Sequence, residues 1–228
     1  MAILVEYNKD WSKLYKQHVK LIKRKLGIKH SNTFHIGATA IKDMPARPVI
    51  DILVVLYDEK AVQGLLEIGY KPAPDGSYIL HTDKIDYSVR LAIIGYTMRL
   101  EKHKQLEMIE PYLAIPFYLS ENKEAAAEFA QKKRTLAAQF EHDPDAYQEA
   151  KKQLLDEILP VAMNYKNQRD KSLSYIAIGM CLGCSIGMCF GVAMNNIGVG
   201  MCIGISVGMC LGLALGAAQT KKDGDTHE

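Results

Sequence analysis

The chain has 228 residues, of which 48% are hydrophobic and 24% are charged, as in an ordinary folded protein of one or two domains. A net charge of +2 without a basic cluster argues against a nucleic-acid partner. The start, MAILVEYNKDW, has no basic residue before its apolar run, and that run is only four residues long, so it does not fit a secretory signal peptide.

Charge divides the chain into two parts. The stretch 172–220 contains no charged residue and holds all five cysteines. We therefore predict a domain over 1–168, an apolar segment over 169–220 and a polar tail over 221–228. The first domain has no cysteine and hence no disulfide framework, which suits a cytoplasmic setting.

The first half of the domain contains one long helical pattern and several strands. Hydrophobic spacing predicts a helix over 10–26, with Asp10 as its N-cap and Gly27 as its stop. The run at 48–57 is nearly all β-branched or apolar, which is typical of a strand buried on both faces. The other expected elements are strands at 32–37, 77–82 and 84–94 and a short helix over 58–67, closed by Gly69.

The pattern becomes helical after Gly95. One helix is predicted over 97–119, interrupted near Pro111 and Pro116. The next two helices are predicted over 120–140, with Ser120 as N-cap, and over 143–165, with Asp143 as N-cap and Pro144 as the first helical residue. The domain is therefore α+β, a small mixed sheet with helices before and after it.

The stretch HIGATAIKDMPARPVIDILVV, residues 35–55, joins a glycine turn to a strand that carries one acid, Asp51. Glycine lets the backbone approach an anion, and N–H groups at such a turn bind phosphate oxygens. The motif resembles the signature of the GrpB family, a His-[Ile/Val]-Gly-[Ser/Ala]-Thr turn followed by Pro-[Val/Ile]-Ile-Asp-Ile. The resemblance extends from YNKDW to DPDAYQEAKKQLLDEIL and covers about residues 5–163.

That family is similar to the polymerase-beta-like nucleotidyltransferases, and the resemblance implies their fold. It also implies a nucleotide or another phosphate-bearing substrate, held by Mg²⁺ as the cofactor. By position, Gly37 and Ala38 take the turn, and Asp51 takes the first catalytic, metal-binding acid. Asp86, on a later strand, is the candidate for the third acid.

The sequence departs from this pattern at several positions. The second acid of the strand would fall at Leu53, and Ala38 replaces the usual small hydroxyl residue. GrpB relatives commonly carry a His-x-His pair where this chain has Ser88 and Arg90. The resemblance therefore implies the fold more firmly than the reaction, because function depends on the site.

The candidate ligand- or phosphate-binding residues each have a structural alternative. Asp51 could be a satisfied acid at a strand end, and Asp86 could pair with Arg90. His35 could be a half-buried histidine with a hydrogen bond, Thr39 could make a local turn bond, and Arg47 could be solvated, although a guanidinium matches phosphate well. The candidates are His35, Gly37, Thr39, Arg47 and Arg90, together with Asp51 and Asp86.

The apolar segment repeats an eight-residue unit in IGMCLGCS, IGMCFGVA, VGMCIGIS and VGMCLGLA. A glycine spacing of four places one bare stripe on a helix, which permits backbone contact between membrane helices. Residues 173–194 and 197–218, about 33 Å each as helices, are long enough to cross a bilayer core, with Asn195 and Asn196 as the turn. The helix-packing residues are Gly179, Gly183, Gly187, Gly191, Gly200, Gly204, Gly208, Gly212 and Gly216.

We therefore predict a glycine-zipper helical hairpin. Basic residues on both flanks favour cytoplasmic ends and a membrane-associated protein. The alternative is a soluble cytoplasmic protein whose hairpin packs on the domain or on other copies, and the glycine stripes invite a homo-oligomer. The repeated Met-Cys pairs could bind Cu(I), but packing explains them as well.

Three functions are compatible with these residues. The first is a Mg²⁺-dependent nucleotidyl or phosphate transferase with an incomplete set of acids. The second is a non-catalytic module that binds a nucleotide or a protein, which Leu53 favours. The third is a scaffold that assembles through its glycine-zipper tail.

Overall fold

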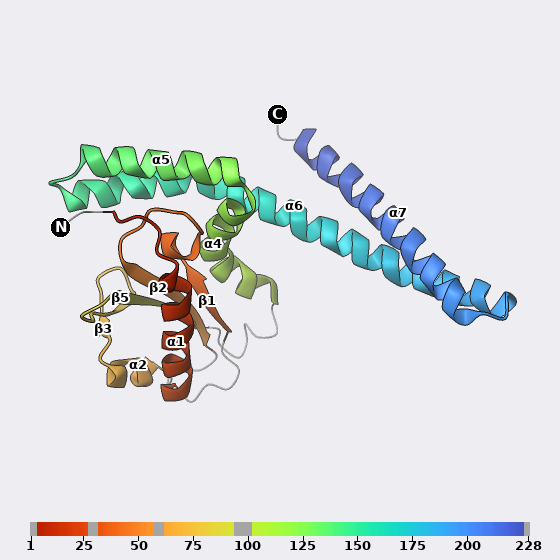
Figure 1. Ribbon diagram of the computed structural model, residues 1–228, viewed down its shortest axis with the longest axis horizontal. Coiled ribbons are helices and arrows are strands. Elements are labelled where there is room, and N and C mark those ends of the chain that lie inside the picture. The colour runs from red at the N-terminus through yellow and green to blue at the C-terminus, as the bar shows by residue number, and fades with distance from the viewer. Residues whose placement is uncertain (1–3, 27–31, 57–61, 94–101, 226–228) are drawn as a thin grey trace. The chain divides into compact units, whose positions relative to one another are not determined.

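A computed structural model describes residues 4–26, 32–56, 62–93 and 102–225 (Figure 1). The chain divides into two compact units, Met1–Met163 and Asn164–Glu228. The predicted stop at Gly27, the first residues of the expected helix over 58–67 and the helical onset after Gly95 lie outside the described residues.

The first unit is built on one mixed sheet of five strands in the order β1-β2-β5-β4-β3. The central strands β2 and β5 are parallel, and every other pair is antiparallel. The strand bounds are β1 Asn32–Ile36, β2 Val49–Leu56, β3 Lys71–Pro72, β4 Tyr78–Leu80 and β5 Asp86–Ile93. The helix bounds are α1 Asp10–Lys25, α2 Val62–Ile68, α4 Lys102–Glu121, α5 Lys123–Gln139, α6 Pro144–Ala193 and α7 Ile197–Asp225, with a 3₁₀ turn, η1, at Ala38–Ala40.

The two faces of this sheet pack against different helices. Alternate residues of β2, including Ile50 and Ile52, join Trp11 of α1 and residues of α2 in the largest apolar cluster. Leu53 points to the opposite face, where it is fully buried in a cluster that includes residues of α4. Asp51 has the same parity as Leu53, so the strand carries its acid to the face that α4 covers.

A second helical layer lies beyond the covered face. Phe129 of α5 and Leu154 of α6 pack with Leu119 of α4 and with Met44, which follows η1. Figure 1 shows α5 and the first part of α6 lying side by side. These contacts bring residues near 45, 130 and 150 together above the end of β2 that carries Asp51.

The small mixed sheet with flanking helices confirms the predicted α+β class, but some helix ends were predicted wrongly. Asp10 is the first residue of α1, and Lys9 is the N-cap position; the Asn8 side chain accepts from the Asp10 N–H at 2.9 Å. Ser120 lies inside α4, and α5 begins at Lys123 after Asn122. The strand β3 was missed because its two exposed residues, Lys-Pro, carry no apolar alternation.

The expected interruption of α4 was also wrong. The helix runs through both Pro111 and Pro116. Each proline removes one backbone donor, yet Ala114 and Leu119 of this helix are buried to 2% exposure or less. Burial of this kind stabilises the helix beyond its local propensity, so the packing outweighs two missing hydrogen bonds.

Helix α6 begins as predicted. Pro144 is its first residue, and the Asp143 carboxylate accepts from the Ala146 N–H at 2.9 Å. The helix then continues through Pro160 to Ala193, so the predicted division at 168 falls inside a helix. Regular structure also continues into the expected polar tail, since α7 ends at Asp225.

The second unit contains the predicted helical hairpin, formed by the end of α6 and by α7. Asn195 has φ of 54°, and with Asn196 it makes the turn between the helices. The glycine stripes meet each other: a Cβ placed on Gly183 would lie 2.9 Å from the Gly208 Cα. Both stripes are thus used within one chain, so self-association would need another face of the hairpin.

Candidate functional site

A pocket of about 250 Å³ lies in the first unit, between the turn that follows β1, the end of β2 and the helices α4, α5 and α6. Its walls are largely apolar, with Ile36, Ile115 and Phe129 among them. Four cationic side chains and one carboxylate also line it. A concave apolar site with a few convergent polar groups is the usual form of a small-molecule site. The charged side chains are Arg47, Arg90, Lys133, Lys151 and Asp51.

The glycine turn packs directly against the acid. Gly37 has φ of 72° and ψ of −170°, a conformation that is almost restricted to glycine. A Cβ at this position would lie 2.5 Å from the Asp51 Oδ2. Gly37 is therefore required twice, for its backbone conformation and for the close approach of the carboxylate.

Asp51 is half-buried at the wall of the pocket, opposite Ser88 in the parallel register of β2 and β5. Burial raises the pKa of this carboxyl, while the positive charges of Lys151 and Arg47 and a hydrogen bond from Ser88 lower it. The carboxylate thus lies among positive charges.

Two lysines reach the pocket from the helical layer. Lys133 of α5 is 1% exposed, and its ammonium donates to the Pro45 carbonyl. Burial and the charges of Lys151 and Arg47 lower the pKa of Lys133 to about 7. Burial and the charge of Arg47 likewise lower the pKa of Lys151 of α6, whereas Asp51 raises it. The cationic groups therefore repel one another, and a bound anion would relieve that repulsion.

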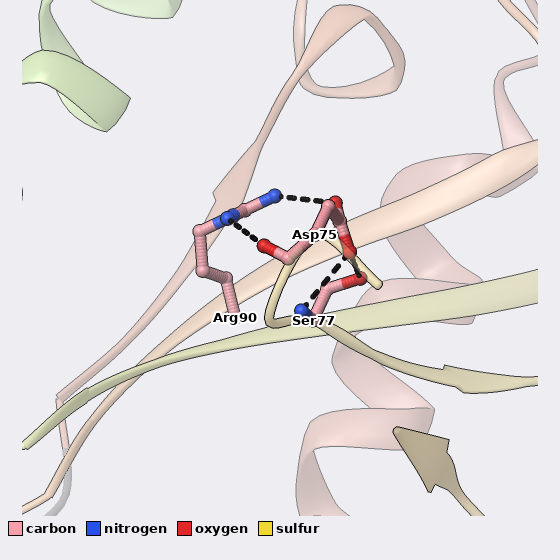
Figure 2. A network of polar contacts seen from close by, with 3 residues as sticks. All are labelled: Asp75, Ser77 and Arg90. Carbon is pink, nitrogen blue, oxygen red and sulfur yellow. Dashed lines mark hydrogen bonds and ion pairs between the residues drawn. The ribbon is translucent and has the colours of Figure 1, made fainter. Parts of the chain in front are cut away.

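Arg90 completes the charged lining from β5. Figure 2 shows its guanidinium turned toward Asp75. The arginine donates to the Asp75 carboxylate at 2.8 Å and to the Asp75 carbonyl at 3.2 Å, and it lies 5.5 Å from the centre of the Tyr112 ring. The Ser77 hydroxyl and N–H hold the same carboxylate at 2.6 and 3.0 Å. Arg90 therefore pairs with Asp75 rather than with Asp86, the partner considered as an alternative from the sequence.

One buried hydroxyl in this pocket has no hydrogen-bond partner among the described residues. Tyr147 of α6 is 1% exposed and lines the pocket, and its hydroxyl makes no hydrogen bond within the described part of the chain. Burial raises the pKa of Tyr147, and the nearby charge of Arg47 lowers it. A buried polar group without a partner costs about 1–3 kcal/mol, so a ligand that bonds this hydroxyl gains affinity.

His35 and Thr39 form hydrogen bonds that stabilise the glycine turn, and only Thr39 also lines the pocket. The Thr39 hydroxyl donates to the Val49 carbonyl at 3.2 Å, so the His35 Nε2, 3.1 Å away, must be the donor to that hydroxyl. The His35 ring stacks on Tyr15 at 4.6 Å, and burial lowers its pKa to about 4. Thr39 lines the pocket, whereas His35 is not part of its lining.

Asp86 lies on β5 two residues before Ser88, the partner of Asp51, and so on the same face of the sheet as Asp51. The Asp86 carboxylate, however, contacts His81 at 2.9 Å and does not contribute to the pocket wall. Leu53, at the position of the second acid, is fully buried in an apolar cluster. No group of three or more His, Cys, Asp or Glu side chains in the described ranges could hold a metal ion. A single acid among four cations does not fit a pair of Mg²⁺ ions.

Among the lining residues that sequence reasoning missed are Lys133, Lys151 and Tyr147. Tyr147 and Lys151 are four residues apart and so share one face of α6, a spacing that could have linked them. Lys133 sits in the run QKKRT, which looks like an ordinary solvated helix face. No local signal marks it, because its burial comes from the packing of α5 over the segment around residue 45.

The fold and the pocket define an α+β protein with a cation-lined site at the end of a mixed sheet. The chain belongs to the GrpB family: the family model described as GrpB protein matches residues 2–160. A second model, described as glycine zipper membrane protein, matches residues 169–222.

Individual relatives agree with the first match. The chain is 30% identical over 165 residues to the glutamate-rich protein GrpB of Alkalihalophilus pseudofirmus, covering 69% of this chain and 94% of that protein. It is 26% identical to the UPF0157 protein BH1888 of Halalkalibacterium halodurans, covering 68% of this chain and 80% of that one. The crystal structure of conserved protein GrpB from Enterococcus faecalis shares the fold, with a TM-score of 0.58, 24% identity, and coverage of 72% of this chain and 99% of that one.

Proposed function

We propose that the GrpB domain binds a phosphate-bearing small molecule, such as a nucleotide, in the pocket beside Asp51. The observation that carries this proposal is the convergence of four cationic side chains on a pocket with one carboxylate. Guanidinium and ammonium groups are the usual side-chain partners of phosphate oxygens. The apolar wall, with Ile36, Ile115 and Phe129, offers a surface for the remainder of the ligand.

The proposed function is ligand binding and not catalysis. The predicted transferase requires several acids around Mg²⁺, whereas the described residues that line this pocket include one. The binding module, the second function expected from the sequence, matches the lining better. The similarity to nucleotidyltransferases stays a prediction drawn from the family resemblance.

Calorimetric titration of the full-length protein in detergent tests this proposal. The ligands are ATP, GTP, CTP, UTP and inorganic pyrophosphate, each in the presence of Mg²⁺. We expect at least one of them to bind, and Arg47→Gln to weaken that binding by about tenfold, since a lost charge-assisted hydrogen bond costs about 1.5–3 kcal/mol. If no member of the panel binds, the proposed function is wrong.

We also propose that the hairpin inserts into a membrane and tethers the GrpB domain to it. Two described helices contain a stretch that is long and apolar enough to cross a bilayer. These helices span 145–193 and 197–219. Only 17% of each apolar window is buried, and large side chains such as Leu182, Phe190 and Leu211 are more than half exposed. An apolar surface of this extent is stable only against lipid or another apolar partner.

Membrane fractionation checks this tether. We expect the full chain to sediment with membranes and to stay there in alkaline carbonate, and a 1–168 truncation to stay in the supernatant. The truncation is a fair control because relatives such as the Alkalihalophilus pseudofirmus protein consist almost wholly of the matched domain. If alkaline carbonate instead releases the full chain from the membranes, the hairpin does not span the bilayer and is a peripheral or soluble glycine zipper.

A further inference from the structure

We propose that lysine and arginine side chains, and not Mg²⁺, hold the phosphate of the ligand in this pocket, with Asp51 as their counter-charge rather than as a metal ligand. This inference rests on the proposed function and specifies how the same site works. It assigns Arg47, Lys133, Lys151 and the Tyr147 hydroxyl to one anion-binding group.

The charged groups that line the pocket influence one another. The charge of Arg47 affects the pKa values of Asp51, Lys133, Lys151 and Tyr147 alike. Arg47 is itself exposed at the mouth, whereas Lys133 is deeply buried. Cationic groups are thus present from the mouth to the floor of the pocket, which is the arrangement that an anion with several oxygens requires.

Two of these cations already have hydrogen-bond partners within the protein. Arg90 is held by Asp75, and Lys133 donates one of its three protons to Pro45. Lys151 faces the half-buried Asp51, whose single negative charge does not balance the surrounding cations. The excess positive charge attracts a further anion and repels a divalent cation.

Tyr147 gives independent support for a ligand. Its hydroxyl is buried, lines the pocket and has no partner in the described part of the chain. A hydroxyl can donate to a phosphate oxygen, and burial raises the pKa of Tyr147, so the hydroxyl keeps its proton for that hydrogen bond. A phosphate oxygen at this position would supply the partner that the buried hydroxyl has not found among the described residues.

Asp51 distinguishes the two arrangements sharply. As a metal ligand, Asp51 would be essential for binding, and Asp51→Asn would abolish it. As a counter-charge, Asp51 competes with the ligand for the same cations. Its isosteric replacement, which preserves the packing against Gly37, should then tighten phosphate binding by about tenfold.

The test is calorimetry on the full-length protein in detergent, with the five phosphate compounds named above, in Mg²⁺ and again in EDTA. We expect the same affinity in both buffers, at least tenfold weaker binding in Lys151→Met, and tighter binding in Asp51→Asn. Lys152→Met is the matched control, because Lys152 is the exposed neighbour on the same helix and should behave as the unmodified protein.

The outcomes separate the two proposals. Binding that requires Mg²⁺, or that is lost in Asp51→Asn, overturns the metal-free site but leaves the proposed function intact. Equal weakening in Lys151→Met and Lys152→Met overturns the assignment of Lys151, since a general loss of surface charge would explain it. Absence of binding in both buffers overturns the proposed function and this inference together.

Discussion

Gly37→Ala should lower the free energy of unfolding of the GrpB domain by about 3 kcal/mol and abolish ligand binding. The new methyl group would lie 2.5 Å from the Asp51 Oδ2 and 3.2 Å from its Cβ. Alanine must also adopt a positive φ of 72°, which strains any residue that has a Cβ. Either the turn or the carboxylate has to move, and both belong to the pocket wall.

Gly76→Ala separates these two causes. Gly76 has a similar φ of 77°, but nothing lies within 4 Å of the Cβ that alanine would add. We expect a loss of only about 1 kcal/mol there, and unchanged binding. Urea unfolding of the 1–168 domain, followed by circular dichroism, measures the difference between the two variants. Equal losses would show that the contact between Gly37 and Asp51 has no energetic consequence.

The part of the site that the sequence revealed is the part encoded in contiguous residues. The turn at Gly37 and the acid at Asp51 belong to one motif, and Thr39 follows the turn directly. A glycine before a β-branched strand is a local signal, and the strand and turn formed where expected. Asp86 was a weaker inference, because its relation to Asp51 depends on how two separate strands pair.

The rest of the site depends on tertiary packing. The contact between Lys133 and the Pro45 carbonyl joins residues 88 apart in the chain, and no local pattern encodes it. Pro111 and Pro116 led to a wrong prediction of a helix break for the same reason. Proline disfavours a helix locally, but the burial of α4 stabilises the helix through tertiary packing. Leu53 had been seen as a missing acid, and its full burial explains why an apolar residue stands there.

The second large effect is expected in the hairpin. Gly204→Ile should separate α7 from the end of α6 and prevent their close packing. A Cβ on Gly204 would lie against the Gly183 carbonyl oxygen and 2.7 Å from the Gly187 Cα. These are backbone atoms, which cannot rotate away as a side chain would. Overpacking of this kind costs about 1–3 kcal/mol for small additions, and isoleucine adds four carbons.

Gly198→Ile is the matched control in the same helix. The nearest atom to a Cβ on Gly198 is the Asn196 Oδ1, at 3.8 Å, so the side chain has room. Electrophoresis of the full chain at increasing SDS concentrations measures when the compact hairpin opens, because the opened form has a different mobility. We expect Gly204→Ile to migrate as the opened form at lower SDS than the unmodified protein, and Gly198→Ile to match that protein.

The glycine variants also decide what the stripes are for. Because the stripes of α6 and α7 face each other, Gly204→Ile should open the hairpin of a single chain, whatever the protein concentration. If the stripes instead joined separate chains, the variant would change the oligomeric state in a concentration-dependent manner and leave the hairpin closed. Phosphate binding should survive in this variant, since every residue of the pocket lies before position 156. Loss of binding together with the hairpin would mean that the tether also controls the site.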